Sequence, residues 1–107
     1  MNTAEGVSKN LRQILRRLSE SDIEGAVYSM ELLGNYRLAE IMTPEYPLGT
    51  TGAKTAADVL RMLNDARERL QESRSPNVKT ATHLIQVALE YWDANVNPPV
   101  PKDTKGD

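Results

Sequence analysis

Apolar residues recur along this chain at spacings of three and four, which is the period of one face of an α-helix. The first two segments with this pattern cover about residues 7–19 and 22–42, and the next two cover about residues 55–74 and 76–95. The pattern therefore predicts four amphipathic helices. The residues expected in the core are Val7, Leu11, Ile14, Leu15 and Leu18 in the first segment, Ile23, Ala26, Val27, Met30, Leu33 and Ile41 in the second, Ala56, Val59, Leu60, Leu63, Ala66 and Leu70 in the third, and Ala81, Leu84, Ile85, Ala88, Leu89 and Trp92 in the fourth, with Val96 at its end.

Polar residues and prolines predict where the last three helices begin. A serine or threonine followed three positions later by an acidic residue can cap the free N–H groups of a helix start, and serine directly before proline favours a first turn. Between the second and third helices, residues 43–54 contain two prolines and two glycines and are expected to form an ordered loop. The predicted start signals are Ser21 with Glu24, Thr55 with Asp58, and Ser75 with Pro76.

Four helices joined by short links and one longer loop predict an all-α fold, a small antiparallel four-helix bundle built from two helical hairpins. A length of 107 residues, with 39% hydrophobic and 26% charged residues, fits one soluble domain. We expect this helical domain to cover residues 1–95. Residues 96–107 form a polar tail rich in proline, without helical periodicity, and are expected to be disordered or extended.

The second segment is apolar on two opposite faces. One face carries the residues expected in the core, and the other carries Tyr28, Leu32, Tyr36 and Ala39 at intervals of about four. A helix in a small domain needs only one buried face, so the second face either contacts another molecule or is buried because this helix is central. The exposed ridge also requires the helix to continue through Gly34, since a glycine costs roughly 1 kcal/mol inside a helix.

Two further apolar side chains lie outside the main apolar face of the fourth segment. Large apolar residues left over beside a core mark interfaces, and tyrosine suits them because it joins an apolar ring to a hydrogen-bonding hydroxyl group. We therefore expect these two residues to extend the second face of the second helix. The predicted protein interface consists of Tyr28, Leu32, Tyr36, Val87 and Tyr91.

The chain offers few residues that could support catalysis or hold a cofactor or a metal. It has no cysteine, and its single histidine, His83, has no carboxylate at the spacing of a helical metal site. Residues 49–55 look like a phosphate-binding loop but have an alanine where that motif requires glycine before the lysine. Glu68 and Glu72 lie one helical turn apart, where charged side chains are usually only solvated. We expect no enzyme activity, no cofactor and no metal site.

A strip of basic residues on the first segment supports an alternative function. Its members are Lys9, Arg12, Arg16 and Arg17. Cations on one helix face can contact phosphates, so a nucleic-acid-binding module or a ribonucleoprotein subunit stays open. The net charge of −2 and the lack of aromatic residues within the strip make it the second hypothesis.

The leading hypothesis is a non-enzymatic protein that acts by protein–protein association, as a homodimer or as an adaptor or regulatory subunit. No apolar run approaches the roughly 20 residues of a membrane-spanning helix, so no membrane partner is expected. A helix lying on a membrane surface is disfavoured by the net negative charge. The absence of cysteine fits a reducing compartment, and the cytoplasm is the expected location.

Overall fold

The computed structural model describes residues 3–38, 49–71 and 77–96, and within them the chain forms helices and no strand. The α-helices are α1 (Thr3–Ser19), α2 (Ile23–Leu32), α4 (Gly49–Gln71) and α5 (Val78–Asn95), and a π-helical segment, η1 (Leu33–Leu38), continues α2. The all-α prediction is confirmed. Nearly all of the predicted C-terminal tail, residues 97–107, lies outside the described residues.

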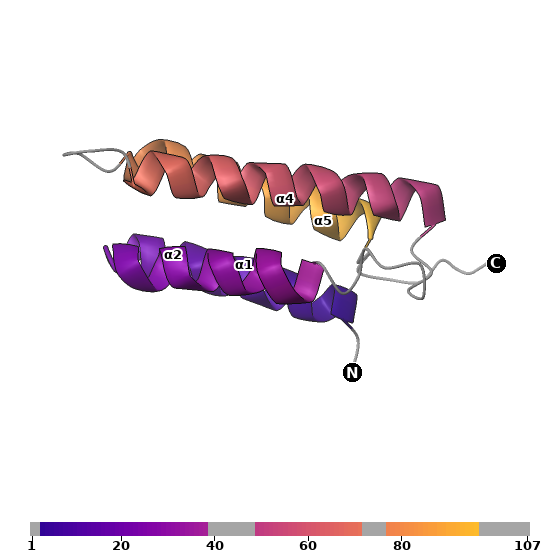
Figure 1. Cartoon of the computed structure of the whole chain (residues 1–107), viewed down its shortest axis with the longest axis horizontal. Helices are drawn as coiled ribbons and strands as arrows, with labels where there is room; N and C mark the ends of the chain where they lie inside the picture. Colours follow the sequence, from indigo (N-terminus) through magenta and orange to yellow (C-terminus); the bar gives the residue numbers. More distant parts are fainter. Residues whose placement is uncertain (1–2, 39–48, 72–76, 97–107) are drawn as a thin grey trace.

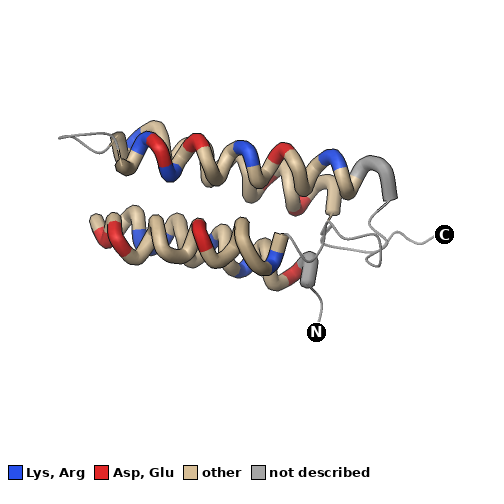
Figure 2. Tube along the Cα trace, in the orientation of Figure 1, with Lys and Arg blue, Asp and Glu red and all other residues tan. Residues whose placement is uncertain are grey.

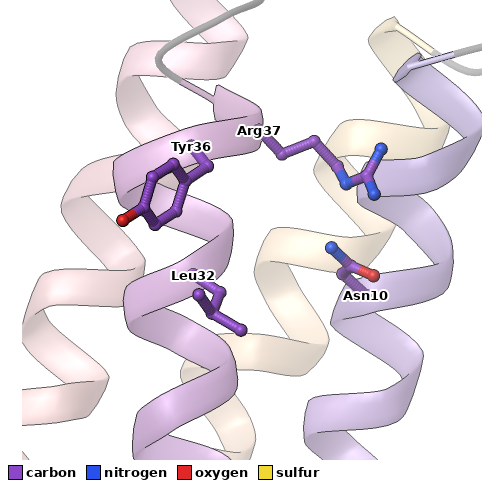
Figure 3. A pocket seen from close by; sticks show the side chains of 4 residues that line it. All are labelled: Asn10, Leu32, Tyr36 and Arg37. Atoms are coloured by element: carbon purple, nitrogen blue, oxygen red, sulfur yellow. The ribbon is translucent and has the colours of Figure 1, made fainter.

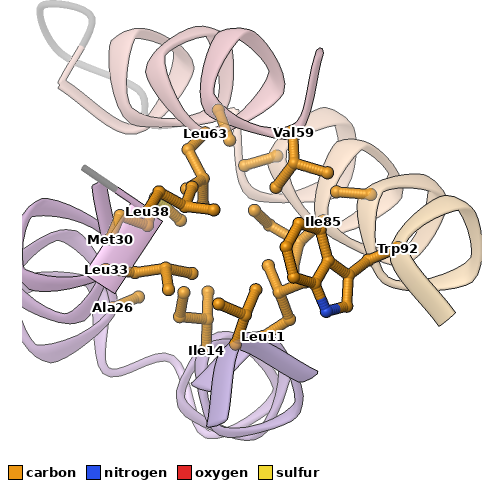
Figure 4. Close-up of a cluster of buried hydrophobic side chains, with 14 of the residues drawn as sticks. Leu11, Ile14, Ala26, Met30, Leu33, Leu38, Val59, Leu63, Ile85 and Trp92 are labelled. Carbon is orange, nitrogen blue, oxygen red and sulfur yellow. The ribbon is translucent and has the colours of Figure 1, made fainter. Parts of the chain in front are cut away.

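The helices form two antiparallel hairpins that lie against each other (Figure 1). α1 and α2 form one hairpin, and α4 and α5 form the other. Each α-helix contacts two neighbours in the cyclic order α1, α2, α4, α5, so that α2 and α5 occupy opposite corners (Figure 4). The predicted four-helix bundle is confirmed. α2 takes a corner of this bundle, so the interpretation that places it at the centre of the fold is wrong.

The interior between the four helices holds most of the predicted core residues (Figure 4). The predicted core residues that are only partly buried at its edge are Leu15, Ile23, Val27, Leu60, Leu84, Leu89 and Val96, and Ile41 lies outside the described residues. Trp92 is the largest fully buried side chain. Each large side chain buried in this way contributes about 1.5–3 kcal/mol to folding. The buried hydrophobic residues are Val7, Leu11, Ile14 and Leu18 in α1, Ala26 and Met30 in α2, Leu33 and Leu38 in η1, Ala56, Val59, Leu63, Ala66 and Leu70 in α4, and Ala81, Ile85, Ala88 and Trp92 in α5.

Two helices begin earlier than the sequence pattern predicts. α1 starts at Thr3, and its first turn carries Glu5, whose negative charge favours a helix N-terminus. α4 starts at Gly49, so the described part of the predicted loop, residues 49–54, is helical and the loop prediction is wrong there. Gly52 is buried, so the inward face of α4 extends to the N-terminal side of the predicted start at Thr55. Thr55 is consequently fully buried within α4, and the prediction that it caps this helix is wrong.

The link between α1 and α2 is closed by a Schellman motif centred on Ser21. The backbone N–H of Ser21 donates to the carbonyl oxygen of Leu18 (3.1 Å), and that of Asp22 donates to the carbonyl oxygen of Arg17 (2.8 Å). Ser21 has a φ of 62°, the left-handed conformation that this motif requires after a helix. Glycine usually occupies the position, because a side chain there is strained.

The caps of α2 and α5 are side chains that the sequence pattern did not single out. Asp22 caps α2, because its Oδ1 atom accepts a hydrogen bond from the backbone N–H of Gly25 (3.0 Å). Ser21 lies one residue earlier, in the left-handed turn. Asn77 caps α5 by accepting the N–H of Thr80 through Oδ1 (3.1 Å). The prediction that Ser21 caps α2 is therefore wrong, and the N-cap of α5 is Asn77; the predicted start signal of Ser75 and Pro76 lies outside the described residues.

The helix of the second segment continues through Gly34 as the π-helical segment η1. Hydrogen bonds in a π-helix join residues five apart, so Leu33 and Leu38 both reach the core. Gly34 lies against α4, where a Cβ atom would come within 3.2 Å of Leu60 Cδ1. Residues 39–42, the last part of the predicted second helix, lie outside the described residues. Continuation of the helix is confirmed as far as Leu38.

The strained turn predicts that Ser21→Gly stabilises the protein. Glycine adopts the left-handed conformation without a Cβ clash, and we expect the free energy of unfolding to rise by about 0.5–1 kcal/mol. Urea denaturation followed by circular dichroism measures this change. The matched control is Ser19→Gly within α1, which is expected to lower the free energy of unfolding by about 0.5 kcal/mol. Equal destabilisation by both variants would contradict the assignment.

Candidate functional site

Three residues of the second segment form an exposed ridge along the outside of the bundle, called here the α2 ridge: Tyr28, Leu32 and Tyr36. Their side chains are 62%, 40% and 69% exposed, respectively. The opposite face of the same helix holds the buried Ala26 and Met30. The two-faced pattern of this helix thus corresponds to one buried face and one exposed apolar face.

A groove of about 580 Å³ runs along the α1 side of the α2 ridge. It is lined by Leu32, Tyr36 and Arg37 from the second segment and by Asn10 from α1 (Figure 3). Arg37 extends from η1 towards α1, and its Nη1 atom would lie 2.6 Å from a Cβ atom at Gly6. The missing side chain of Gly6 therefore leaves the space that this guanidinium group occupies.

A smaller groove of about 260 Å³ lies on the other side of the ridge, against the end of α4. Its apolar lining is provided by Ile23, Val27, Tyr28 and Leu70, and its charged lining by Glu24 and Glu31. Glu31 Oε2 lies 3.7 Å from Arg67 Nη1 of α4, an ion pair that spans the contact between the two helices. The ridge is thus flanked by a groove with a basic residue on one side and by a groove with acidic residues on the other.

Two residues of the predicted interface lie elsewhere. Val87 and Tyr91 belong to α5, at the corner of the bundle opposite α2. Val87 is 37% exposed, whereas Tyr91 packs against the core and its hydroxyl group donates to Asp58 Oδ2 of α4 (3.1 Å). The structure therefore brings Tyr28, Leu32 and Tyr36 together and separates them from Val87 and Tyr91.

Sequence reasoning missed Asn10 and Arg37 as members of this surface. At 100° per residue, Arg37 would lie about 140° around the helix from Leu32. The π-helical turn changes this relation, because residues five apart lie nearly above one another in it. Leu32 and Arg37 consequently line the same groove. A glycine within a strongly apolar helix was the signal in the sequence that the helical phase could change at this point.

Two members of the predicted basic strip already have carboxylate partners. Arg12 Nη2 lies 3.2 Å from Asp93 Oδ2 of α5, and its Nη1 donates to Ser8 Oγ (2.9 Å). Arg17 Nη1 lies 3.0 Å from Asp22 Oδ2 at the turn into α2. Both cations therefore link α1 to a neighbouring part of the bundle.

The remaining two members of the strip are exposed. Lys9 and Arg16 point away from the core of the bundle and line a groove of about 270 Å³ together with Asn10. Arg12 and Gln13 complete this lining. Because Asn10 also lines the groove beside Leu32 and Tyr36, the two grooves adjoin on the α1 side of the α2 ridge.

The other candidate residues do not form a chemical site in the described part of the chain. His83 and Glu68 are exposed, and Glu72 lies outside the described residues. Within residues 3–38, 49–71 and 77–96, no three histidine, cysteine or acidic side chains are grouped to hold a metal ion. None of the helices described there combines the length and apolar content needed to cross a lipid bilayer.

Comparison with known proteins finds no family model, no curated protein and no solved structure that matches this chain. The fold and its surface are therefore the observations from which a function is inferred. Among the surface features, the α2 ridge is the most specific, since contiguous exposed apolar side chains mark interaction sites more often than scattered ones.

The hydrogen bond of Tyr91 predicts that this residue contributes to stability. In Tyr91→Phe, the part-buried Asp58 loses a donor, and we expect the free energy of unfolding to fall by about 1 kcal/mol. In the matched control, Tyr28→Phe, the lost hydroxyl group is exposed, and a change within about 0.5 kcal/mol is expected. Urea denaturation compares the two variants, and equal effects would argue against an intramolecular role for Tyr91.

Proposed function

We propose that this protein acts by binding other protein molecules through the α2 ridge, without catalysing a reaction. The observation that carries the proposal is the exposure of Tyr28, Leu32 and Tyr36 together on the outside of the bundle. Large apolar side chains gathered in one surface patch commonly mark interaction sites, and tyrosine is enriched in them. The buried core draws on the opposite face of α2, so the ridge is not needed to hold the bundle together.

The spacing of the ridge suits a contact with another helix. Residues four apart form the row of side chains that packs into the groove of a partner helix, and Leu32 lies between two tyrosines in this row. The partner in this proposal is a second copy of the chain, in a symmetric homodimer, or a helix of another protein for which the chain serves as an adaptor or regulatory subunit.

Two features of the chain support a function without catalysis. General acid–base and nucleophilic catalysis require an activated group beside a suitable partner. The single histidine, His83, is exposed on α5, and the chain contains no cysteine. A cytoplasmic location belongs to the same proposal, because a chain without cysteine fits a reducing compartment.

Leu32→Glu tests association through the ridge. Leu32 is 40% exposed, so the new carboxylate stays solvated in the free protein but introduces an unpaired charge into an interface. We expect the wild-type chain to self-associate or to capture a protein partner and the variant to lose this association. Light scattering coupled to size-exclusion chromatography measures self-association, and pull-down from native lysate with mass spectrometry measures capture.

The matched control is Gln86→Glu, which adds the same charge at an exposed position of α5. This control is expected to keep the oligomeric state and the captured proteins of the wild type. The proposal is contradicted if the wild-type chain is monomeric and if, in addition, the wild type and Leu32→Glu capture the same proteins.

Nucleic-acid binding through α1 is the second candidate. Its support is the exposure of Lys9 and Arg16 along one groove. Arg12 and Arg17 already pair with carboxylates. Of the four cations in the strip, Lys9 and Arg16 are therefore the two that can contact phosphates without the loss of one of these ion pairs. Affinity for a phosphate backbone grows with the number of neutralised phosphates, and two contacts provide only weak binding. Protein association through the ridge is therefore the preferred function.

A further inference from the structure

The two sides of the α2 ridge differ in charge. The charged residues that line the groove towards α4 are Glu24 and Glu31. Among the described residues that line the adjoining grooves towards α1, every charged one is basic. We call the surface on that side the basic face; it comprises Lys9, Asn10, Arg16, Leu32, Tyr36 and Arg37.

This charge is a local property of the basic face. The whole chain has a net charge of −2. α1 nevertheless carries four basic residues and a single acidic one, Glu5. In α4, by contrast, four basic residues are mixed with three acidic ones along the helix (Figure 2). The excess of positive charge is thus larger on α1, which lies beside Leu32 and Tyr36, than on α4.

We infer that the basic face binds an acidic amphipathic helix of a partner protein. Apolar side chains of that helix pack against Leu32 and Tyr36, and its carboxylates face Lys9 and Arg16, with Arg37 at the edge of the same groove. The inference rests on the proposed function and adds the chemistry of the partner. Charge complementarity of this kind sets the orientation and specificity of an interface.

The spacing of the cations matches a helical partner. Lys9 and Arg16 lie seven residues apart on α1, which corresponds to roughly 10 Å along the helix axis. Acidic residues at positions i and i+7 of a partner helix have the same spacing. The side chain of Asn10, between the two grooves, offers a hydrogen-bond donor and an acceptor to the partner backbone or side chains.

Other occupants fit the basic face less well. A second copy that used this same face in a symmetric contact would bring identical cations together. Single-stranded nucleic acid binds through successive aromatic stacking platforms, and among the described residues that line these grooves Tyr36 is the one aromatic side chain. A bilayer surface binds basic helices that carry a broad apolar face, whereas the described apolar residues of the basic face are Leu32 and Tyr36.

A binding measurement with designed peptides tests the inference. The probe is a fluorescein-labelled amphipathic peptide of about 14 residues, long enough for about four helical turns, with glutamates on one face and leucines on the other. Fluorescence anisotropy at low and at physiological ionic strength measures its affinity. The double variant Lys9→Glu/Arg16→Glu is expected to weaken binding by about tenfold or more, and rising salt to weaken binding to the wild type.

The matched control is Lys54→Glu/Lys79→Glu, which changes the net charge by the same amount at exposed positions of α4 and α5. Its affinity for the peptide is expected to stay within about twofold of the wild type. An equal loss in both double variants would overturn the inference, since the effect would then reflect net charge alone. Tighter binding to poly(U) RNA or to phosphatidylserine vesicles would also overturn it, by assigning the face to another class of partner.

A neutral peptide separates the inference from the proposed function. It carries glutamine in place of every glutamate and is expected to bind the wild type at least about tenfold more weakly than the acidic peptide. If both peptides bind equally and Leu32→Gln abolishes both interactions, the acidic partner is excluded and association through the ridge stands. If Leu32→Gln leaves the binding of both unchanged, the ridge is not the contact surface and the proposed function fails.

Discussion

Every helix of this bundle shares one interior, and this constraint decides what remains on the surface. Four helices in a ring can each turn only one face inward, and the ring of α1, α2, α4 and α5 is filled by side chains such as Leu11, Leu63 and Trp92. A helix with two apolar faces must then expose one of them. The exposure of the α2 ridge is therefore a consequence of the geometry of the core and of the corner position of α2.

The π-helical segment η1 shapes the surface beside the ridge. By joining residues five apart, it keeps Leu38 in the core behind Leu33 and turns Arg37 to the α1 side of the helix. Two glycines accommodate this arrangement, since Gly34 faces Leu60 of α4 and Gly6 leaves space for the guanidinium group of Arg37. One irregular turn thus links the packing of the core to the charge of the neighbouring groove.

The two sides of the α2 ridge carry opposite charges, so the surface is electrostatically asymmetric across the ridge. Glu24 and Glu31 lie on the α4 side, and Arg37 lies on the α1 side with the cations of α1 beyond it. Apolar contacts supply most of the free energy of association, whereas charge selects the partner and its orientation. On the proposal made above, these charges would distinguish among partner helices of similar hydrophobicity.

The sequence by itself determined the four helices, their inward faces and the apolar ridge of the second helix, because helical periodicity is a local property of spacing. Only the tertiary structure decided which polar groups act as caps and which apolar residues stay exposed on the surface of the bundle. Ser21 does not cap α2 because the turn after α1 holds it in a left-handed conformation. Tyr91 is separated from the α2 ridge because α5 lies at the opposite corner of the bundle, where its hydroxyl group donates to Asp58 of α4. These outcomes depend on contacts between helices, which the spacing of residues along one helix does not contain.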